Sequence, residues 1–134
     1  MRADHILAYA WAAPCTVVGL ILAGVMTASV GTHWQVVNGV IEVCPAPARS
    51  PGRKGALATC PFAAITLGHV VAGISREDLA RLRAHEHAHV RQYERWGVFF
   101  FLAYPVAGAW QLLRGRRAHR DNPFEIEARN AEVE

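Results

Sequence analysis

Three histidines and one glutamate lie close together in the segment RAHEHAHVRQYERWG, residues 83–97. His85, His87 and His89 occupy alternate positions, and Glu86 follows the first of them. In an α-helix, residues four apart share a face, so His85 and His89 can reach one metal ion while His87 points elsewhere. This HExxH spacing is typical of zinc sites in which a neighbouring glutamate takes a proton from water. In a strand, all three histidines would share a face and could capture a metal together.

The residues around the histidines favour the helix. Ser75 and Asp78 have the spacing of a capping box, which satisfies free backbone amides at a helix start. Side chains then recur at intervals of three and four, as on one helical face: Leu79, Leu82, Glu86, His89 and Tyr93. We therefore predict that His85 and His89 are metal ligands and that Glu86 is a general base. The alternative is a polar helix whose histidines are solvated.

A catalytic zinc site needs a third protein ligand, and a second helix downstream offers one. In DNPFEIEARNAE, Asn122 is a suitable N-cap and Pro123 a suitable first helical residue. Glu125 and Glu127 follow, and on a helix two such residues project about 200° apart, so only one can face the metal. The spacing leaves both glutamates open as the third ligand. Glu125 has an alternative role at the helix start, where a glutamate favours the positive end of the helix dipole.

HEHAH followed by NPFEIEA resembles the gluzincin metallopeptidases, most closely the membrane-bound type that includes the CAAX prenyl proteases and the HtpX-like proteases. In those families a first helix carries HExxH, and a later helix supplies a glutamate ligand within an E-x-x-A-D setting. The resemblance covers roughly residues 63–131. It implies that His85, His89 and Glu125 bind Zn²⁺. It also implies a metalloendopeptidase that hydrolyses peptide bonds through a zinc-bound water, with Glu86 as the general base. The same segments also resemble small bacterial membrane proteins with an N-terminal apolar span.

Two features depart from the family pattern. Arg129 follows Ala128 where the family has an aspartate, and the stretch from 97 to 113 replaces a longer paired-span insertion. Both features favour an alternative function, namely a non-catalytic, membrane-associated metal-binding or interaction protein that retains the zinc-site residues.

Composition points to a membrane. Hydrophobic residues make up 52% of the 134 residues and charged residues 19%. Residues 6–30 are almost wholly apolar or small, and 25 residues suffice to cross about 30 Å of hydrocarbon. We predict a retained anchor over residues 1–31 and a zincin-like domain over 32–134. A cleaved signal peptide is the alternative, although its apolar region normally runs only about 7 to 15 residues.

The distribution of charged residues indicates which partners and which membrane orientation to expect. The formal charge is +3 without a dense basic stripe, so no nucleic-acid partner is expected, and a lipid bilayer is the expected partner besides a peptide or protein substrate. Basic residues are few before the apolar span and more numerous soon after it: Arg2 against Arg49, Arg53 and Lys54. This bias predicts that the domain faces the cytoplasm. Together with the resemblance to small bacterial membrane proteins, it implies a location in a bacterial inner membrane.

The charge-free stretch from Gly97 to Leu113 limits the topology. If it crossed the bilayer once, His89 and Glu125 would lie on opposite sides and could not share a metal. We therefore predict a helix that lies in the interface or packs against the rest of the protein, with the basic RGRRAHR segment after it near lipid headgroups. Candidates for stabilising an oxyanion are Tyr104, Arg117 and His119, although each is more typical of a surface or interfacial residue.

The remaining segments predict an α+β fold with a small sheet of about three strands. THWQVVNGVIEVC has two short strands around the turn Asn38-Gly39. Residues 63–74 are rich in β-branched side chains and predict one further strand, whose edge could bind an extended peptide. Cys44 and Cys60 flank the loop between these strands and could form a disulfide in an oxidising compartment, whereas they would stay reduced in the cytoplasm. His33 and His69 are expected to be structural.

Overall fold

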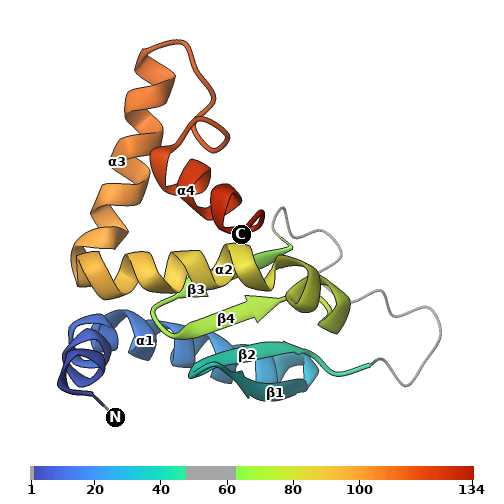
Figure 1. The fold of residues 1–134 in the computed structure, drawn as a ribbon. Coiled ribbons are helices and arrows are strands. Elements are labelled where there is room, and N and C mark those ends of the chain that lie inside the picture. Colours follow the sequence, from blue (N-terminus) through green and yellow to red (C-terminus); the bar gives the residue numbers. More distant parts are fainter. Residues whose placement is uncertain (1, 48–62) are drawn as a thin grey trace.

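The computed structural model describes residues 2–47 and 63–134 of the chain and confirms the α+β class (Figure 1). Its elements in chain order are α1 (Ala3–Val30), β1 (Thr32–Val37), β2 (Val40–Pro45), β3 (Ala64–Leu67), β4 (Val70–Gly73), α2 (Arg76–Trp96), the short 3-10 helix η2 (Gly97–Phe99), α3 (Phe100–Leu113) and α4 (Pro123–Ala131).

The four strands form one mixed sheet in the order β1-β2-β4-β3. β1 and β2 are antiparallel and meet at the turn Asn38-Gly39, which confirms the predicted hairpin. β3 and β4 are also antiparallel, whereas β2 and β4 pair in parallel, with Ile41 opposite Val70. β3 is therefore an edge strand, as the predicted peptide-binding edge requires.

The prediction of one strand over residues 63–74 is wrong. The segment forms two strands, β3 and β4, with Gly68 and His69 in the turn between them, so the sheet has four strands. Gly68 has φ 62°, and a Cβ there would lie only 2.4 Å from the backbone nitrogen and Oγ1 of Thr16. The turn therefore needs glycine both for its backbone conformation and for its close approach to α1.

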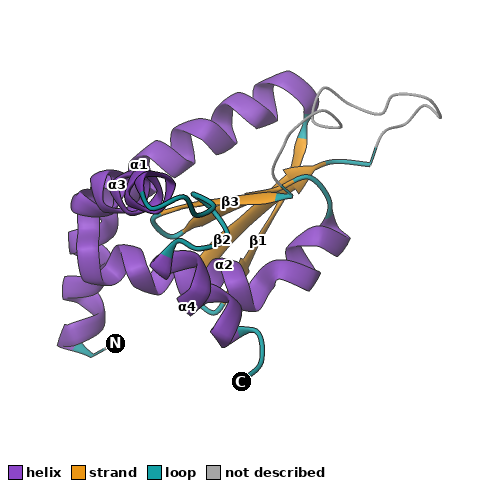
Figure 2. Ribbon diagram, turned by 90° about the horizontal axis from the view of Figure 1, so that it is seen from above, coloured by secondary structure: helices purple, strands orange, loops and turns teal. Residues whose placement is uncertain are grey.

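The sheet lies between α1 on one face and α2 on the other (Figure 2). Because neighbouring residues of a strand point to opposite faces, adjacent valines of β4 belong to two different cores. Val70 packs with Val43 and Ala23 on the α1 side, and Val71 packs with Leu79 and Val90 on the α2 side.

α1 presents a narrow face of small residues to the rest of the protein. Its buried residues recur at intervals of three and four: Ala12, Cys15, Gly19 and Ala23. Large apolar residues of its other faces are exposed, such as Leu7, Ile21 and Val25. α1 and the helical segment Arg76–Leu113 are long and apolar enough to cross a membrane, although length and composition alone are weak evidence. The separate anchor over residues 1–31 stays a prediction.

The helix that carries the histidines begins and ends as local sequence dictates. The Ser75 side chain accepts a hydrogen bond from the Asp78 backbone N–H at 3.0 Å, which confirms the cap. The helix ends at Gly97, which has φ 56°. A Cβ at Gly97 would lie 2.6 Å from the Trp11 ring, so only glycine allows α1 to approach this corner.

Beyond the corner, α3 stands out from the body of the molecule, and α4 returns to lie beside α2 (Figure 1). The apolar segment 97–113 therefore does not separate the two halves of the candidate site. Asn122 caps α4 by accepting a hydrogen bond from the Phe124 N–H at 3.1 Å, as predicted. Its side chain also donates to the Tyr104 carbonyl at 3.1 Å, which ties α4 to α3.

Cys44 is buried in β2, whereas Cys60 lies outside the described residues, as do Arg49, Arg53 and Lys54. The disulfide and the charge bias that uses these basic residues stay predictions.

Candidate metal centre

Two histidines of α2 and one glutamate of α4 meet between the two helices. His85 Nε2 lies 3.0 Å from Glu125 Oε2, and His89 Nε2 lies 3.3 Å from Glu125 Oε1. The two Nε2 atoms are 3.2 Å apart. Zinc bonds of about 2.0–2.1 Å in tetrahedral geometry put neighbouring ligand atoms about 3.3 Å apart. The three side chains thus have the separations that one small cation requires.

The hydrogen bonds on the far side of each imidazole fix where its proton lies. His85 Nδ1 lies 2.7 Å from Glu132 Oε1, and His89 Nδ1 lies 2.8 Å from Gln92 Oε1. The Gln92 amide orientation is set by its Nε2, which donates to the Phe124 carbonyl at 2.9 Å. Both Nδ1 atoms therefore face acceptors and carry hydrogen, which leaves the two Nε2 lone pairs directed at each other and at a carboxylate.

The two Nε2 lone pairs and the Glu125 carboxylate are hydrogen-bond acceptors that point at one place, so a positive charge between them would stabilise the arrangement. Burial raises the pKa of Glu125, but the hydrogen bonds that His85 and His89 donate when they are protonated, together with the one from Tyr104, lower it by more, so its pKa lies well below the ordinary value. The Glu125 carboxylate raises the pKa of His85 despite burial. Burial lowers the pKa of His89, and Glu125 and Gln92 outweigh that effect and raise it. The same carboxylate that attracts protons to the imidazoles is suited to hold a metal cation in their place.

Glu86 lies beside the three candidate ligands and faces the same cleft. It is buried, and its Oε2 accepts a hydrogen bond of 2.6 Å from Thr66 Oγ1 on the edge strand β3. The hydroxyl of Thr66 therefore orients the carboxylate that the sequence predicts to be the general base.

A cleft of about 340 Å³ opens at this site between β3, α2, α3 and the segment after α3. Its polar end carries Glu86 and the three candidate ligands, and its apolar walls include Ile65 and Leu67 of β3 and Phe101 and Pro105 of α3. The site is thus open to a ligand that extends along the sheet edge.

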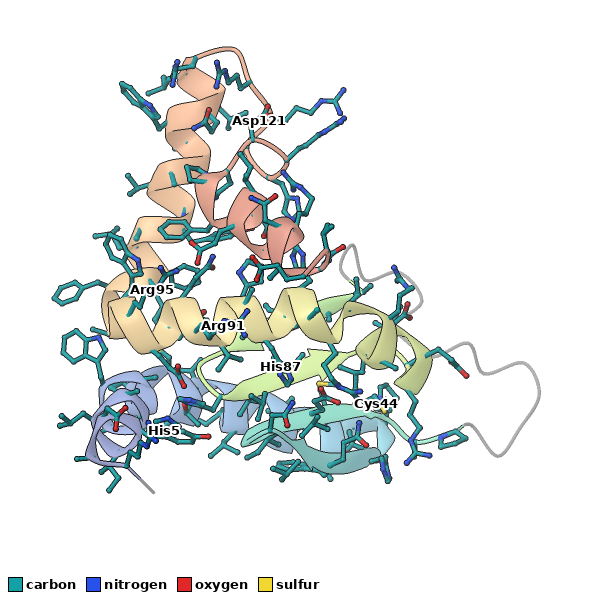
Figure 3. The ribbon with its side chains drawn as sticks, in the orientation of Figure 1. His5, Cys44, His87, Arg91, Arg95 and Asp121 are labelled. Carbon is teal, nitrogen blue, oxygen red and sulfur yellow. The ribbon has the colours of Figure 1, made fainter. Side chains whose placement is uncertain are left out.

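The predicted oxyanion candidates lie at different depths. The Tyr104 hydroxyl donates to Glu125 Oε1 at 2.6 Å and so supports the carboxylate. His119 lines the cleft with its side chain 73% exposed, and its Nε2 is 3.3 Å from the same oxygen. Arg117 is exposed, and its backbone N–H donates to Asp121 in the loop between α3 and α4 (Figure 3).

His87 turns away from the metal centre, as the helix predicts. It points from α2 towards the sheet (Figure 3), where its Nε2 lies 3.2 Å from Glu42 Oε1. Glu127 also lies elsewhere, because its carboxylate pairs with Arg95 on the surface. Of the two glutamates left open by the sequence, Glu125 is the one at the site.

The other two histidines considered from sequence make structural contacts. His69 Nε2 lies 2.9 Å from Glu94 Oε1, and its ring stacks on Tyr9 of α1 at 3.9 Å. His33 lies beside the Arg76 guanidinium, and its Nε2 contacts Arg76 Nη2 at 2.5 Å.

Three residues of the site were not identified from the sequence: Thr66, Gln92 and Glu132. Gln92 carries a usable signal, because it lies three residues after His89 and therefore on the same helical face. Thr66 is a polar residue within the apolar run of β3. Glu132 follows Glu125 by two helical turns.

Comparison of the chain with protein-family models, curated proteins and solved structures gives no match. What is shown is a His-His-Glu triad with the spacing of an HExxH motif, in which His89 and Glu125 are buried and His85 is partly buried.

Proposed function

We propose that this protein is a membrane-anchored zinc-dependent peptidase that hydrolyses peptide bonds, with His85, His89 and Glu125 as zinc ligands. The observation that carries the proposal is the convergence of two imidazole lone pairs and a carboxylate beside Glu86, at the floor of an open cleft. A bound zinc ion would supply Lewis-acid activation of water and of the scissile carbonyl.

The chain's own residues account for the proton transfers of the reaction. Hydrolysis adds water across the peptide bond, so one proton must leave the water and one must reach the departing amine nitrogen. Glu86 is placed to take the first and deliver the second, because Thr66 holds its carboxylate in the cleft. β3 is an edge strand of the described sheet, and an edge strand offers backbone groups to an extended peptide.

The membrane association rests on α1. Its outward residues are apolar and exposed, and its inner face of small residues joins it to the sheet. We place the domain on the cytoplasmic side of a bacterial inner membrane, on the charge bias described for the sequence. The lipid bilayer and a peptide or protein substrate are the proposed partners.

A second function is supported by Arg129. Its side chain contacts the Arg120 carbonyl in the preceding loop and makes no described hydrogen bond to the histidines or to Glu125. The support that the related families draw from an aspartate at this position is absent here. A non-catalytic protein that binds metal through the same triad is the alternative.

Zinc content and peptide hydrolysis of wild type, Glu86→Gln and Glu77→Gln separate these functions. Glu77 is an exposed glutamate of the same helix, so its variant controls for the loss of a carboxylate. We expect all three proteins to retain zinc and Glu86→Gln alone to lose hydrolysis, by a factor on the order of 10² to 10⁴. Equal cleavage by wild type and Glu86→Gln would remove Glu86 from the mechanism. Zinc without cleavage of any peptide, even by wild type, would favour the alternative.

A further inference from the structure

α3 carries an apolar surface that the described residues leave uncovered. Its exposed side chains recur along one side of the helix: Phe99 at its base, then Leu102, Val106, Trp110 and Leu113, which are 59%, 66%, 56%, 57% and 82% exposed. We call this row the α3 stripe. It continues at its base to α1, because the Trp11 and Phe99 rings are 6.1 Å apart.

The polar groups of α3 are turned away from the stripe. Tyr104 donates to Glu125, and Gln111 is buried. Apart from the Trp110 indole, the side chains of the stripe have no hydrogen-bonding group. A protein partner normally forms about one hydrogen bond per 100–200 Å² of interface, whereas hydrocarbon requires none. The chemistry of the stripe therefore favours lipid over a second protein.

Positive charge lies directly beyond the stripe. The segment after α3 contains four exposed arginines: Arg114, Arg116, Arg117 and Arg120. An apolar helical face bordered by arginine is complementary to a bilayer with anionic headgroups. Trp110, near the end of the helix, suits the boundary between headgroups and hydrocarbon.

The length of α3 and the contact between the residues that flank it indicate that this helix lies in the bilayer surface and does not cross the bilayer. Its 14 residues span about 21 Å as a helix, less than the hydrocarbon thickness of about 30 Å. Both ends of the α3 segment also return to one site, because His89 and Glu125 are in contact. A crossing would separate them and would put the arginines into hydrocarbon.

We propose that the α3 stripe and the arginines after it dock into the interface of an anionic bilayer. This surface adds to the membrane association proposed for α1 and is independent of the metal chemistry. Because Phe101 and Pro105 of the same helix line the cleft, docking brings the opening of the cleft close to the lipid surface.

A site-specific fluorescent probe tests the docking in the full-length protein. Cys15, Cys44 and Cys60 are replaced by alanine, and a single cysteine carries an environment-sensitive dye at Val106→Cys or, as a control, at Glu77→Cys. Glu77 is exposed in the first turn of α2, which covers the opposite face of the sheet from α1. The protein is reconstituted into vesicles of phosphatidylcholine with or without phosphatidylglycerol, and some lipids carry a quencher on the acyl chain.

We expect the dye at 106 to be quenched by the acyl-chain quencher and the dye at 77 to remain accessible to a quencher in water. Replacing Arg114, Arg116 and Arg117 by glutamine should weaken the docking equilibrium in the anionic vesicles about fivefold per residue, the equivalent of about 1 kcal/mol each. The control Arg81→Gln removes an arginine whose side chain is 64% exposed on α2 and should change nothing.

Several results would overturn the proposal. Equal exposure of the dyes at 106 and 77 to the aqueous quencher would show that α3 is not in lipid. Unchanged quenching in the arginine variants would show that binding of anionic headgroups by these arginines does not contribute to docking. A dye signal at 106 that depends on protein concentration without vesicles would assign the stripe to a second copy of the chain. Leu113→Cys, at an 82% exposed position, repeats the test if Val106→Cys does not fold.

Discussion

Gln92 links the two helices of the candidate metal centre through a single amide. It is fully buried, its Oε1 faces His89 Nδ1, and its Nε2 donates to the carbonyl of Phe124, the residue directly before Glu125. One side chain therefore orients an imidazole ligand and holds the backbone that presents the carboxylate ligand. Partners of this kind set both the tautomer and the direction of a metal-binding histidine.

Replacing Gln92 by leucine should lower zinc affinity about 10- to 100-fold, because His89 loses the acceptor that fixes its tautomer. Gln92→Glu keeps an acceptor for His89 and should lose less. The matched control is Gln111→Leu, since Gln111 is also buried but its Oε1 has no hydrogen-bond partner among the described residues. Affinity is measured by competition with a chromophoric chelator, after unfolding curves show that each variant is folded. Equal losses in Gln92→Leu and Gln111→Leu would refute the positioning role.

For single residues, the sequence predicted side chains that have a fixed spacing in a helix. It missed side chains that reach the site only through contacts formed in the folded protein. His85 and His89 follow from helical periodicity and from the cap of their helix. Spacing left Glu125 and Glu127 open, and the resemblance to the gluzincins implied Glu125. Glu132 contacts His85 from 47 positions away, and no local pattern indicates that contact.

A second polar network joins the elements of the fold on the other side of α2. Glu42 of β2 is 1% exposed and accepts hydrogen bonds from Gln35 of β1 at 2.7 Å and from Arg83 of α2 at 2.8 and 2.9 Å. Burial raises the pKa of Glu42, but these partners outweigh it, so its pKa lies below the ordinary value of 4.5. Because burial lowers the pKa of His87, this third neighbour is neutral at pH 7.

The pKa of Glu42 gives a pH dependence of stability with a definite sign. A carboxylate whose pKa is lowered by folding stabilises the protein above pH 4.5, and the contribution is lost as the pH falls through the folded-state value. Glu42→Gln should therefore be destabilised at pH 7 by about 1–3 kcal/mol, since Arg83 loses its charged partner. The difference from wild type should shrink in acid. Urea unfolding in detergent micelles at several pH values measures it, with Glu77→Gln as the exposed control. A difference that is constant between neutral and acid pH would contradict the prediction.

Local sequence determined most elements but not all of them. The Ser75 cap, the Asn38-Gly39 turn and the Asn122-Pro123 start are short-range signals, and each predicted element forms. The β3–β4 turn was missed because β-branched residues on both sides of Gly68 give a continuous strand pattern. The deciding factor there is contact with Thr16, which lies 52 positions earlier in the chain.

At the candidate metal centre, residues far apart in the chain join the C-terminal helix to the rest of the molecule. α4 follows a segment that stands out from the body, and it is joined to α2 through Glu125, Glu132 and the Gln92 link. A cation shared by the two helices would strengthen this junction, because only the folded chain presents all three ligands.

Zinc should therefore stabilise the folded protein, by about 2.7 kcal/mol when its free concentration is 100 times the dissociation constant. Amide hydrogen exchange in α4 should slow when zinc is added and recover when a chelator removes it. His89→Ala should abolish the response, whereas His87→Ala should keep it, since His87 contacts Glu42 instead of the site. An identical zinc response in the two variants would show that the metal binds elsewhere.

The arrangement of the whole molecule could not be predicted from the sequence. The α+β class follows from the predicted helices and strands. The strand order depends on the parallel pairing of β2 with β4, which joins strands on either side of the segment 48–62. The return of α4 to α2 was required by the predicted ligand set, but its path depends on the corner at Gly97 and on the Asn122–Tyr104 contact.

The corner at Gly97 also affects the order of folding. Both hairpins close over short turns and can form early, whereas the contact between His85 and Glu125 spans 40 positions and closes only when α4 returns to α2. The three candidate ligands therefore cannot meet before α4 has been synthesised and has returned to α2. On the proposed function, a nascent or partly folded chain would be inert, and proteolytic activity would begin only once the polypeptide is complete and folded.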